Sequence, residues 1–281
     1  MRVRPMQSHD VEAAFAVSAA AFDDLARRRG EPPEPPAPLS MARFRVGRPL
    51  ATDPGGAWVA ESDGEVVGAA LAVVREGVWG LSLLVVRPDA QSAGAGRELL
   101  ARAYGYGNGA RGWIVLASSD PRALRAYACL GLDLHPAVAA RGRPRAAAVP
   151  EVRRGDADDL PLTEAVDRAV RGAAHGADIL ALIETGGRLL ILPERGYAIV
   201  RGGEVRLLAA LDEDAATTLL RGCLATTDGE VASVRWVTSA QKWAIGPCVE
   251  AGLELRSDGG AVFLAGDVGP FAPYLPSGAY L

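Results

Sequence analysis

A glycine-rich turn at residues 87–97 carries the residues of this sequence that are best suited to chemistry. It reads RPDAQSAGAGR, follows an apolar run that breaks at Pro88, and leads into a helical pattern. A glycine-rich turn that opens a helix leaves backbone N–H groups unpaired at the positive end of the helix dipole. Such a turn is typical of a site that binds an anion, for example a phosphate group.

Two common phosphate-binding motifs fit this turn poorly. A P-loop needs a Lys after its last glycine, and no such Lys is present. The dinucleotide fingerprint needs a third glycine, where this chain has Leu99, and an acidic residue after the next strand, where only Asp120 is available. The pattern that remains is Q-x-x-G-x-G, followed by Arg97.

Two motifs in order resemble the GNAT superfamily of N-acyltransferases. LLVVRPDAQSAGAGRELL is similar to its acyl-CoA-binding motif, and SSDPRALRAYACLGLDL is similar to its next motif, in which a Tyr precedes a Gly by four residues, as Tyr127 precedes Gly131 here. The resemblance covers residues 81–134. It implies acetyl-CoA or a related acyl-CoA as donor and an amine, on a small molecule or a peptide, as acceptor.

The resemblance also implies roles for single residues. The backbone N–H groups of 91–96 would bind the CoA diphosphate, Arg97 would add positive charge, and the backbone of 84–86 would pair with the pantetheine arm and polarise the thioester carbonyl. Arg97 could equally be a solvated surface residue. The cofactor-binding residues predicted in this way are Leu84, Val85, Val86, Gln91, Ser92, Ala93, Gly94, Ala95, Gly96 and Arg97.

Tyr127 is the predicted general acid, because a positioned phenol can protonate a departing thiolate. The alternative is a Tyr that only packs in its helix. The general base stays open. The strand LSLLVV has Ser82 as its only polar side chain, so the candidates are Glu61, Glu76, Asp120, a chain of waters or the carboxylate of Leu281.

The elements that must position these residues form a mixed α/β pattern. Ser8 is a plausible N-cap of a helix that runs to about Arg29 and buries Phe15 and Phe22. The segment 31–39, EPPEPPAPL, is a loop, either a spacer or the rim of a substrate cleft. A hairpin over 57–74 turns at Asp63-Gly64, and the remaining elements are a strand over 81–86, a helix over 94–106, a strand over 112–118 and a helix over 120–130 capped by Asp120.

The second half repeats part of this plan. GYAIVRGGEV (196–205) resembles the hairpin AWVAESDGEV (57–66), and AGLEL (251–255) resembles LGLDL (130–134). These offsets make the second copy 18 residues shorter, in the interval that holds strand 81–86 and the glycine loop in the first. We therefore predict two GNAT-like domains, each a mixed, mostly antiparallel sheet flanked by helices, over residues 1–148 and 149–281, with the second degenerate.

Composition sets outer limits on function. The net charge of −4 argues against nucleic-acid binding, and it divides into +3 over 1–149 and −7 over 150–281. Three scattered histidines and three cysteines predict neither a metal site nor a disulfide framework. We expect a cytoplasmic protein without a membrane span, as a monomer or homodimer.

Three functions fit these residues. The first is an N-acetyltransferase in which the amine attacks directly in a ternary complex. The second is a non-catalytic acyl-CoA-binding sensor or scaffold, which the missing base favours. The third is a transferase of thiol biosynthesis acting on an amino-sugar thiol precursor. Against the third, those tandem relatives keep a functional motif in the second half, and this chain does not.

Overall fold

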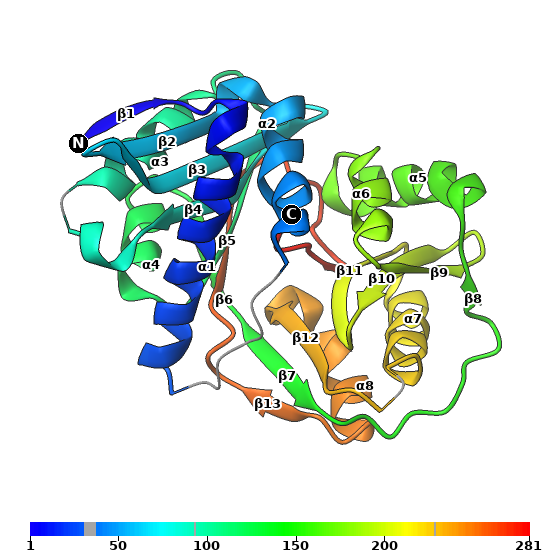
Figure 1. Ribbon diagram of the computed structural model, residues 1–281. Helices are drawn as coiled ribbons and strands as arrows, with labels where there is room; N and C mark the ends of the chain where they lie inside the picture. The colour runs from blue at the N-terminus through cyan, green and yellow to red at the C-terminus, as the bar shows by residue number, and fades with distance from the viewer. Residues whose placement is uncertain (31–37, 93, 228) are drawn as a thin grey trace. The chain divides into compact units, whose positions relative to one another are not determined.

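The computed structural model describes residues 1–30, 38–92, 94–227 and 229–281. By its contacts the chain divides into two units (Figure 1). Unit 1 comprises Met1–Val74 and Trp79–Ala110, and unit 2 comprises Arg75–Val78 and Arg111–Leu281. The domain boundary at 148/149 stays a prediction. Because most of segment 31–39 lies outside the described residues, the loop expected there is not described.

Unit 1 is built on four strands in the order β1-β2-β3-β4. The predicted hairpin turn is confirmed: Asp63 and Gly64 have φ of 53° and 82°, the positive values that a tight two-residue turn needs. Hydrophobic residues of α1 and of the segment after it pack on β2, β3 and β4. The elements are β1 (Arg2–Pro5), α1 (Val11–Arg28), α2 (Arg48–Thr52), β2 (Ala57–Ser62), β3 (Glu65–Arg75), β4 (Val78–Val86) and α3 (Ala95–Gly105), with short helical turns at Ser8–Asp10, Leu39–Met41, Arg43–Gly47, Pro54–Gly56 and Pro88–Ala90.

The start of the first helix differs from our prediction. Ser8 is not the N-cap of a long helix, because residues Ser8–Asp10 form a 3-10 turn before α1 begins at Val11. Asp10 closes this turn by accepting a hydrogen bond from the Gln7 N–H at 2.8 Å, and it also pairs with Arg4 at 2.7 Å. Phe22 is 50% exposed, so it does not face the core.

Unit 2 holds the remaining helices and strands. Asp120 caps α4 as predicted, its side chain accepting from the Arg122 N–H. The elements are β5 (Gly112–Ala117), α4 (Pro121–Ala128), β6 (Asp133–Pro136), β7 (Val138–Gly142), β8 (Arg153–Arg154), α5 (Leu160–Arg171), α6 (Asp178–Glu184), β9 (Arg188–Leu192), β10 (Gly196–Arg201), β11 (Glu204–Ala210), α7 (Glu213–Ala225), β12 (Ala232–Val237), α8 (Ile245–Glu250), β13 (Glu254–Arg256), β14 (Ala261–Gly266) and β15 (Tyr274–Leu275), with short helical turns at Ala157–Asp159 and Ser239–Ala244.

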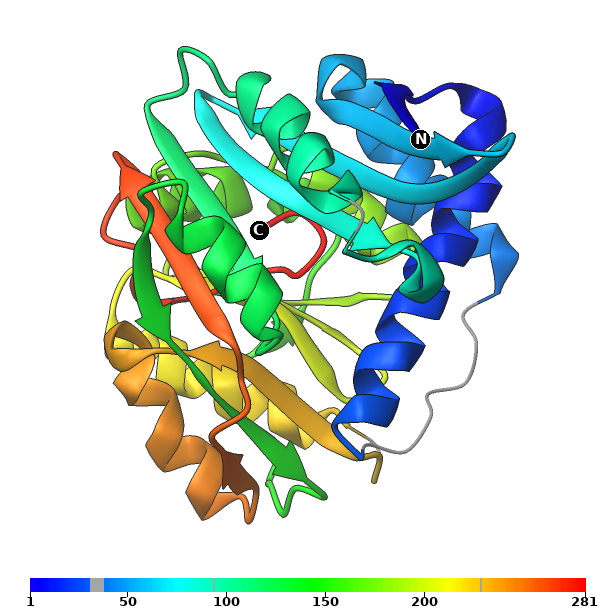
Figure 2. The ribbon, with the colours of Figure 1, turned by 90° about the vertical axis from the view of Figure 1, so that its left-hand side faces the viewer.

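Within unit 2, the two halves of the sequence exchange strands. β14, from the second half, pairs antiparallel with both β5 and β6, so it lies between two strands of the first half. β7, from the first half, pairs with both β12 and β13 of the second. Figure 2 shows the orange strand β14 beside green strands of the first half. Antiparallel pairs predominate, and β11 and β12 are parallel, so the predicted mixed α/β class with mostly antiparallel sheets flanked by helices is confirmed.

The strand order corrects our alignment of the repeat. Seven strands of the eight-stranded sheet of unit 2 run in the order β13-β7-β12-β11-β10-β9-β8, and the eighth, β15, pairs with β11. The hairpin 196–205 joins β10 and β11, which are the third and fourth strands of the run β8-β9-β10-β11. The hairpin 57–66 joins β2 and β3, which are the second and third strands of unit 1. The second copy lacks no strand; the connection after its fourth strand is short instead. Eight residues separate β4 from α3, but two separate β11 from α7.

Candidate functional site

The loop that follows strand β4 is hydrogen-bonded to the end of the strand. The Gln91 side-chain amide donates a hydrogen bond to the Val86 carbonyl at 3.0 Å, and the Arg87 N–H donates to the Val67 carbonyl of β3 at 2.8 Å. Arg87 also pairs with Glu65 at 2.9 Å. These contacts fix the direction in which the chain leaves the strand, and they give Gln91 a structural role besides the binding role predicted for it.

The first turn of α3 is open to an anion. Gly94 is its N-cap residue with φ +89°, a value that L side chains rarely adopt, and no described side chain caps the helix. The Glu98 N–H makes the first helical hydrogen bond, to the Gly94 carbonyl at 3.2 Å. The N–H groups of 95–97 precede it at the positive end of the helix dipole, which suits a phosphate.

Close packing sets the position of α3 on the sheet. A Cβ on Gly68 of β3 would lie 2.9 Å from Leu99 Cδ1 and 3.1 Å from the Val85 carbonyl oxygen, so a side chain there would displace Leu99 and crowd the strand backbone. At the other end of the helix, the Trp79 indole N–H donates to the Ala103 carbonyl at 3.0 Å. Strands β3 and β4 therefore contact α3 at Leu99, in its middle, and at Ala103, near its end.

The predicted cofactor-binding residues in unit 1 form one continuous segment from the end of β4 to the first turn of α3. Ser92, Gly94 and Arg97 are exposed, whereas Val85 and Ala95 are buried; Leu84, Val86, Gln91 and Gly96 are half-buried. Ala93 lies outside the described residues. A shallow pocket of about 390 Å³ is lined by Gly94 and Arg97 together with Met1, Glu98 and Ala101.

Arg45 is a residue that sequence reasoning missed. It lies in the π-helical turn Arg43–Gly47 and donates to the Ser82 hydroxyl at 2.8 Å and to the Ser82 carbonyl at 2.6 Å. Ser82 is two residues before Leu84 on β4 and is buried. A π-helical turn is rare and frequently marks a functional site. The sequence signal was the one polar residue in an apolar strand, which needs a partner when it is buried.

Tyr127 lies in unit 2, on α4. Its side chain is 5% exposed and meets the Phe263 ring edge-to-face, with ring centroids 5.7 Å apart. Burial raises the pKa of the phenol above its usual value, with a smaller contribution from the charge of Asp120. The phenol therefore keeps its proton throughout the neutral pH range, and its raised pKa makes it a weaker proton donor to a thiolate than an ordinary tyrosine.

The candidate bases are all engaged in other contacts. Glu61 pairs with Arg4 at 2.8 Å, and Asp120 pairs with Arg122 at 2.7 Å. Glu76 pairs with Arg168 at 2.7 Å, which holds the pKa of its carboxyl below the usual value and weakens it as a base. The oxygen of Leu281 is buried in unit 2, where Arg171 donates to it at 2.8 Å.

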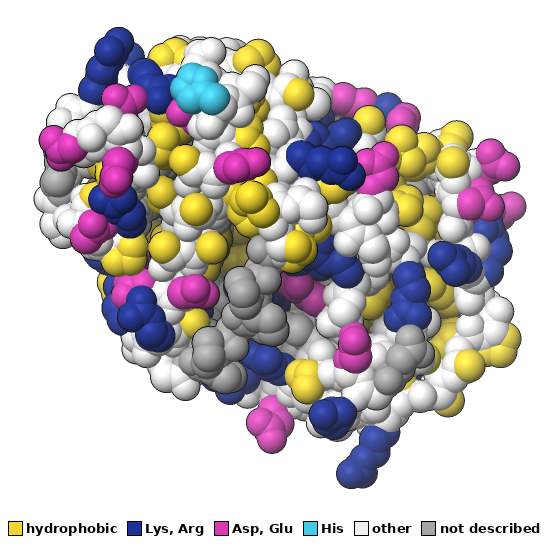
Figure 3. Space-filling view, in the orientation of Figure 1, with side chains coloured by type: hydrophobic (Ala, Val, Ile, Leu, Met, Phe, Trp, Pro, Cys, Tyr) yellow, Lys and Arg dark blue, Asp and Glu magenta, His cyan; other side chains and the backbone are white. Residues whose placement is uncertain are grey.

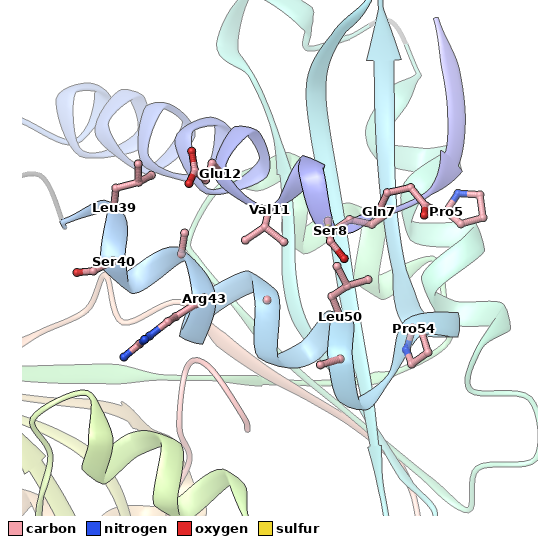
Figure 4. A pocket seen from close by; sticks show the side chains of 14 residues that line it. Pro5, Gln7, Ser8, Val11, Glu12, Leu39, Ser40, Arg43, Leu50 and Pro54 are labelled. Carbon is pink, nitrogen blue, oxygen red and sulfur yellow. The ribbon is translucent and has the colours of Figure 1, made fainter.

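A larger pocket in unit 1, of about 770 Å³, contains none of the predicted site residues (Figure 4). It lies between the start of α1 and the segment 39–54. Apolar side chains such as Val11 and Leu50 line it together with the polar side chains of Ser8, Glu12 and Ser40. Leu39, the last residue of the proline-rich segment 31–39, and Ser40 after it both line this pocket.

No group of three His, Cys, Asp or Glu residues able to hold a metal ion occurs among the described residues. No helix within the described ranges is long and apolar enough to cross a membrane. Figure 3 shows basic and acidic side chains interspersed on the visible face, in keeping with surface ion pairs such as Arg195–Asp212 at 2.6 Å.

The chain is similar in sequence to one protein family and in fold to several solved structures. Residues 20–132 match the model of the Acetyltransferase (GNAT) family. A search of curated proteins gives no match. Among solved structures, a protein from Pyrococcus horikoshii has a TM-score of 0.77 at 16% identity, covering 99% of this chain and 94% of its own. A GCN5-related N-acetyltransferase from Sphaerobacter thermophilus has a TM-score of 0.58 at 15% sequence identity, and the match covers 94% of each chain. A GCN5-related N-acetyltransferase from Kribbella flavida has a TM-score of 0.52 at 15% sequence identity, and the match covers 97% of this chain and 72% of that one. At such low identities, the TM-scores show a shared fold alone.

Proposed function

We propose that the chain transfers an acetyl group from acetyl-CoA to a primary amine, because residues 20–132 match the model of the Acetyltransferase (GNAT) family. The observation that supports this best is the uncapped, glycine-opened N-terminus of α3, at the end of the eight-residue connection from β4. A helix end of this kind binds a diphosphate through backbone N–H groups. The acceptor is an amine on a small molecule or a peptide.

The reaction is a direct attack in a ternary complex. The amine nitrogen bonds to the acyl carbon, the carbon–sulfur bond breaks, and the nitrogen loses a proton. The backbone of Leu84 to Val86 would align the pantetheine arm and polarise the carbonyl. Tyr127 would give its phenolic proton to the departing thiolate, and the amine proton would leave through water, because Glu61, Glu76 and Asp120 are each held by an arginine.

A thiol-release assay with acetyl-CoA and a panel of amines tests this function. The panel includes small diamines, amino acids, and peptides with a free N-terminus or a lysine. We expect turnover with at least one amine, and Tyr127→Phe should lower kcat by about 100-fold while leaving the Kd for CoA unchanged. Tyr104→Phe is the matched control, since this tyrosine packs edge-to-face on Trp79 in unit 1.

The second candidate function is a non-catalytic acyl-CoA sensor, which the engagement of every candidate carboxylate favours. It predicts CoA binding with no turnover for any amine, and no difference between the wild type and Tyr127→Phe in any assay. Absence of CoA binding to the intact chain would contradict both functions.

A further inference from the structure

The fourth strand of the second copy changes its partner along its length. β11 pairs in parallel with β12 near its start, at Glu204 and Ser233. Further along, Leu208 and Ala209 pair antiparallel with Leu275 and Tyr274 of β15. The Ala210 N–H also donates to the Pro273 carbonyl at 3.2 Å. Tyr274 and Leu275 therefore form a short added strand on β11, and all of segment 271–281 except Ala272 and Gly278 is buried.

The end of this segment is held by a buried polar cluster. Three polar atoms converge on the Leu281 oxygen: Arg171 Nε and the Tyr274 hydroxyl each donate to it at 2.8 Å, and His175 Nε2 lies 2.7 Å from it. Leu281 is fully buried. Hydrogen bonds in which a donor is charged are the stronger ones, so this arrangement is a specific receptor for one oxygen atom.

A second layer holds the donors in place. Asp167 accepts from the His175 backbone N–H at 3.0 Å and lies 2.8 Å from His175 Nδ1, which directs Nε2 toward Leu281. The Tyr197 hydroxyl donates to the other Asp167 oxygen at 2.5 Å. Asp167, Arg171, His175, Tyr197 and Tyr274 are each at most 1% exposed. Burial of so many polar groups is costly unless each has a partner, and here each one does.

The position of the segment matches the position expected for the cofactor in the first copy. The run β8-β9-β10-β11 repeats β1-β2-β3-β4, so β11 corresponds to β4, and α7 follows β11 as α3 follows β4. The backbone of β4 is where the pantetheine arm is expected to pair. On β11, the backbone at the same end of the strand already pairs with β15.

The part of the second copy that would bind a diphosphate is closed. The connection from β11 to α7 is reduced to Leu211 and Asp212, and the Asp212 side chain accepts from the Ala215 N–H at 2.8 Å. A carboxylate therefore occupies the helix end that is open in α3. Asp212 itself pairs with Arg195 at 2.6 Å.

We propose that the second copy is a peptide-binding module whose groove, along the part of β11 beyond its pairing with β12, is filled by residues 271–281 of the same chain. The groove recognises an extended segment through strand pairing and through the cluster Asp167, Arg171, His175 and Tyr197. Its correspondence with a cofactor groove rests on the function proposed above, whereas the peptide recognition does not.

Cleavage of the intact chain tests this assignment. A protease site is inserted between Gly269 and Pro270, which are both exposed. After cleavage, we expect fragment 270–281 to stay bound through gel filtration and to leave only with denaturant. Immediate loss of the fragment, with an unchanged midpoint of thermal unfolding, would overturn the proposal.

Substitutions in the cluster test whether it contributes to the affinity for the segment. The fragment is removed from the cleaved protein in denaturant, and a labelled synthetic peptide of residues 271–281 is added on refolding. Arg171→Met or His175→Ala should then raise the peptide's Kd by about tenfold or more. Arg221→Met is the control, since Arg221 lies on the surface of α7 and pairs with Glu250. Equal affinity in all variants would show that the cluster does not recognise the segment. Titration of the same samples with CoA measures binding by the first copy separately. A failure of the proposed acetyltransferase function can therefore be distinguished from a failure of the peptide-binding proposal.

Discussion

At the scale of single residues, the two glycines of the turn have different reasons to be glycine. Gly94 needs its positive φ for the chain to enter α3. Gly96 does not: a Cβ there would lie 3.6 Å from Val86 Cγ2, an ordinary contact. The folded chain therefore tolerates a methyl group at Gly96, and the space in front of it is available to a ligand.

Gly96→Ala should separate binding from stability. Alanine is the better helix former by about 1 kcal/mol, so the thermal unfolding midpoint should stay or rise. The added methyl group lies on the helix end that would meet the diphosphate, so the Kd for CoA, measured by calorimetry, should rise about tenfold or more. Gly105→Ala, at the other end of α3 with open space around it, is the control and should leave CoA binding unchanged. Unchanged CoA affinity in Gly96→Ala would place the diphosphate elsewhere.

Arg45 is expected to act by positioning β4. Arg45→Ala removes two hydrogen bonds to Ser82 and should lower the free energy of unfolding by about 1–3 kcal/mol. If the role is positioning, Arg45→Ala should also lower kcat more than it raises KM for acetyl-CoA, and Arg45→Lys should restore part of kcat. Arg43→Ala, an exposed residue of the same turn, serves as the comparison. A loss of stability with unchanged kcat would leave Arg45 a purely structural residue.

The buried thiol of Cys248 should make stability fall at alkaline pH. Burial raises the pKa of this thiol from 9.0 to about 12. The folded state therefore keeps a proton that the unfolded state releases, so this stabilisation is complete below pH 9 and is lost as pH rises toward 12. Cys248→Ala should flatten the decline of the unfolding midpoint in that window, measured by circular dichroism. Cys129→Ala, at an exposed thiol, should leave the slope as it is.

At the scale of elements, the sequence predicted best those turns and helix caps that depend only on neighbouring residues. The Asp63-Gly64 turn, the Asp120 cap followed by Pro121, and the passage from β4 into α3 are each encoded by two or three neighbouring residues. Turn and cap residues act through their own backbone, so no distant partner is needed to recognise them. The segment that carries the predicted cofactor residues was found for this reason.

Contacts between distant segments were not predictable in this way. Nothing in the pattern of Ala261–Gly266 indicates that it pairs with Gly112–Ala117, about 150 residues earlier. The hairpin alignment failed because a short hairpin motif carries no information on its place in the sheet. His175 was judged solitary, because Asp167, Tyr274 and Leu281 approach it only in the folded chain. Arg45 was missed for the same reason, since its partner Ser82 is far away in sequence.

The cap of α7 provides a test at this scale. Asp212→Ala removes the bond to the Ala215 N–H and should lower the free energy of unfolding by about 1 kcal/mol. Asp214→Ala is the matched control: it also loses an ion pair with Arg195 but leaves the cap intact, and should cost less. Chemical denaturation measures both. Equal costs would mean that the ion pair, and not the cap, stabilises the helix start.

At the scale of the whole molecule, the two copies should differ in ligand capacity. Only the first has an eight-residue connection opening on an uncapped helix, and the charge of the chain is divided in the same sense, +3 over residues 1–149 and −7 over 150–281. Calorimetric titration should give one CoA per chain, with an affinity that falls as salt is added, because a diphosphate is held by charge and N–H dipoles. Gly96→Ala should weaken this one site and reveal no other. In Asp212→Ala the stoichiometry should remain one, because uncapping α7 does not restore the missing connection and segment 271–281 still pairs with β11. Two equivalents bound by the wild type, or a second site gained in Asp212→Ala, would show that the second copy has kept a cofactor groove.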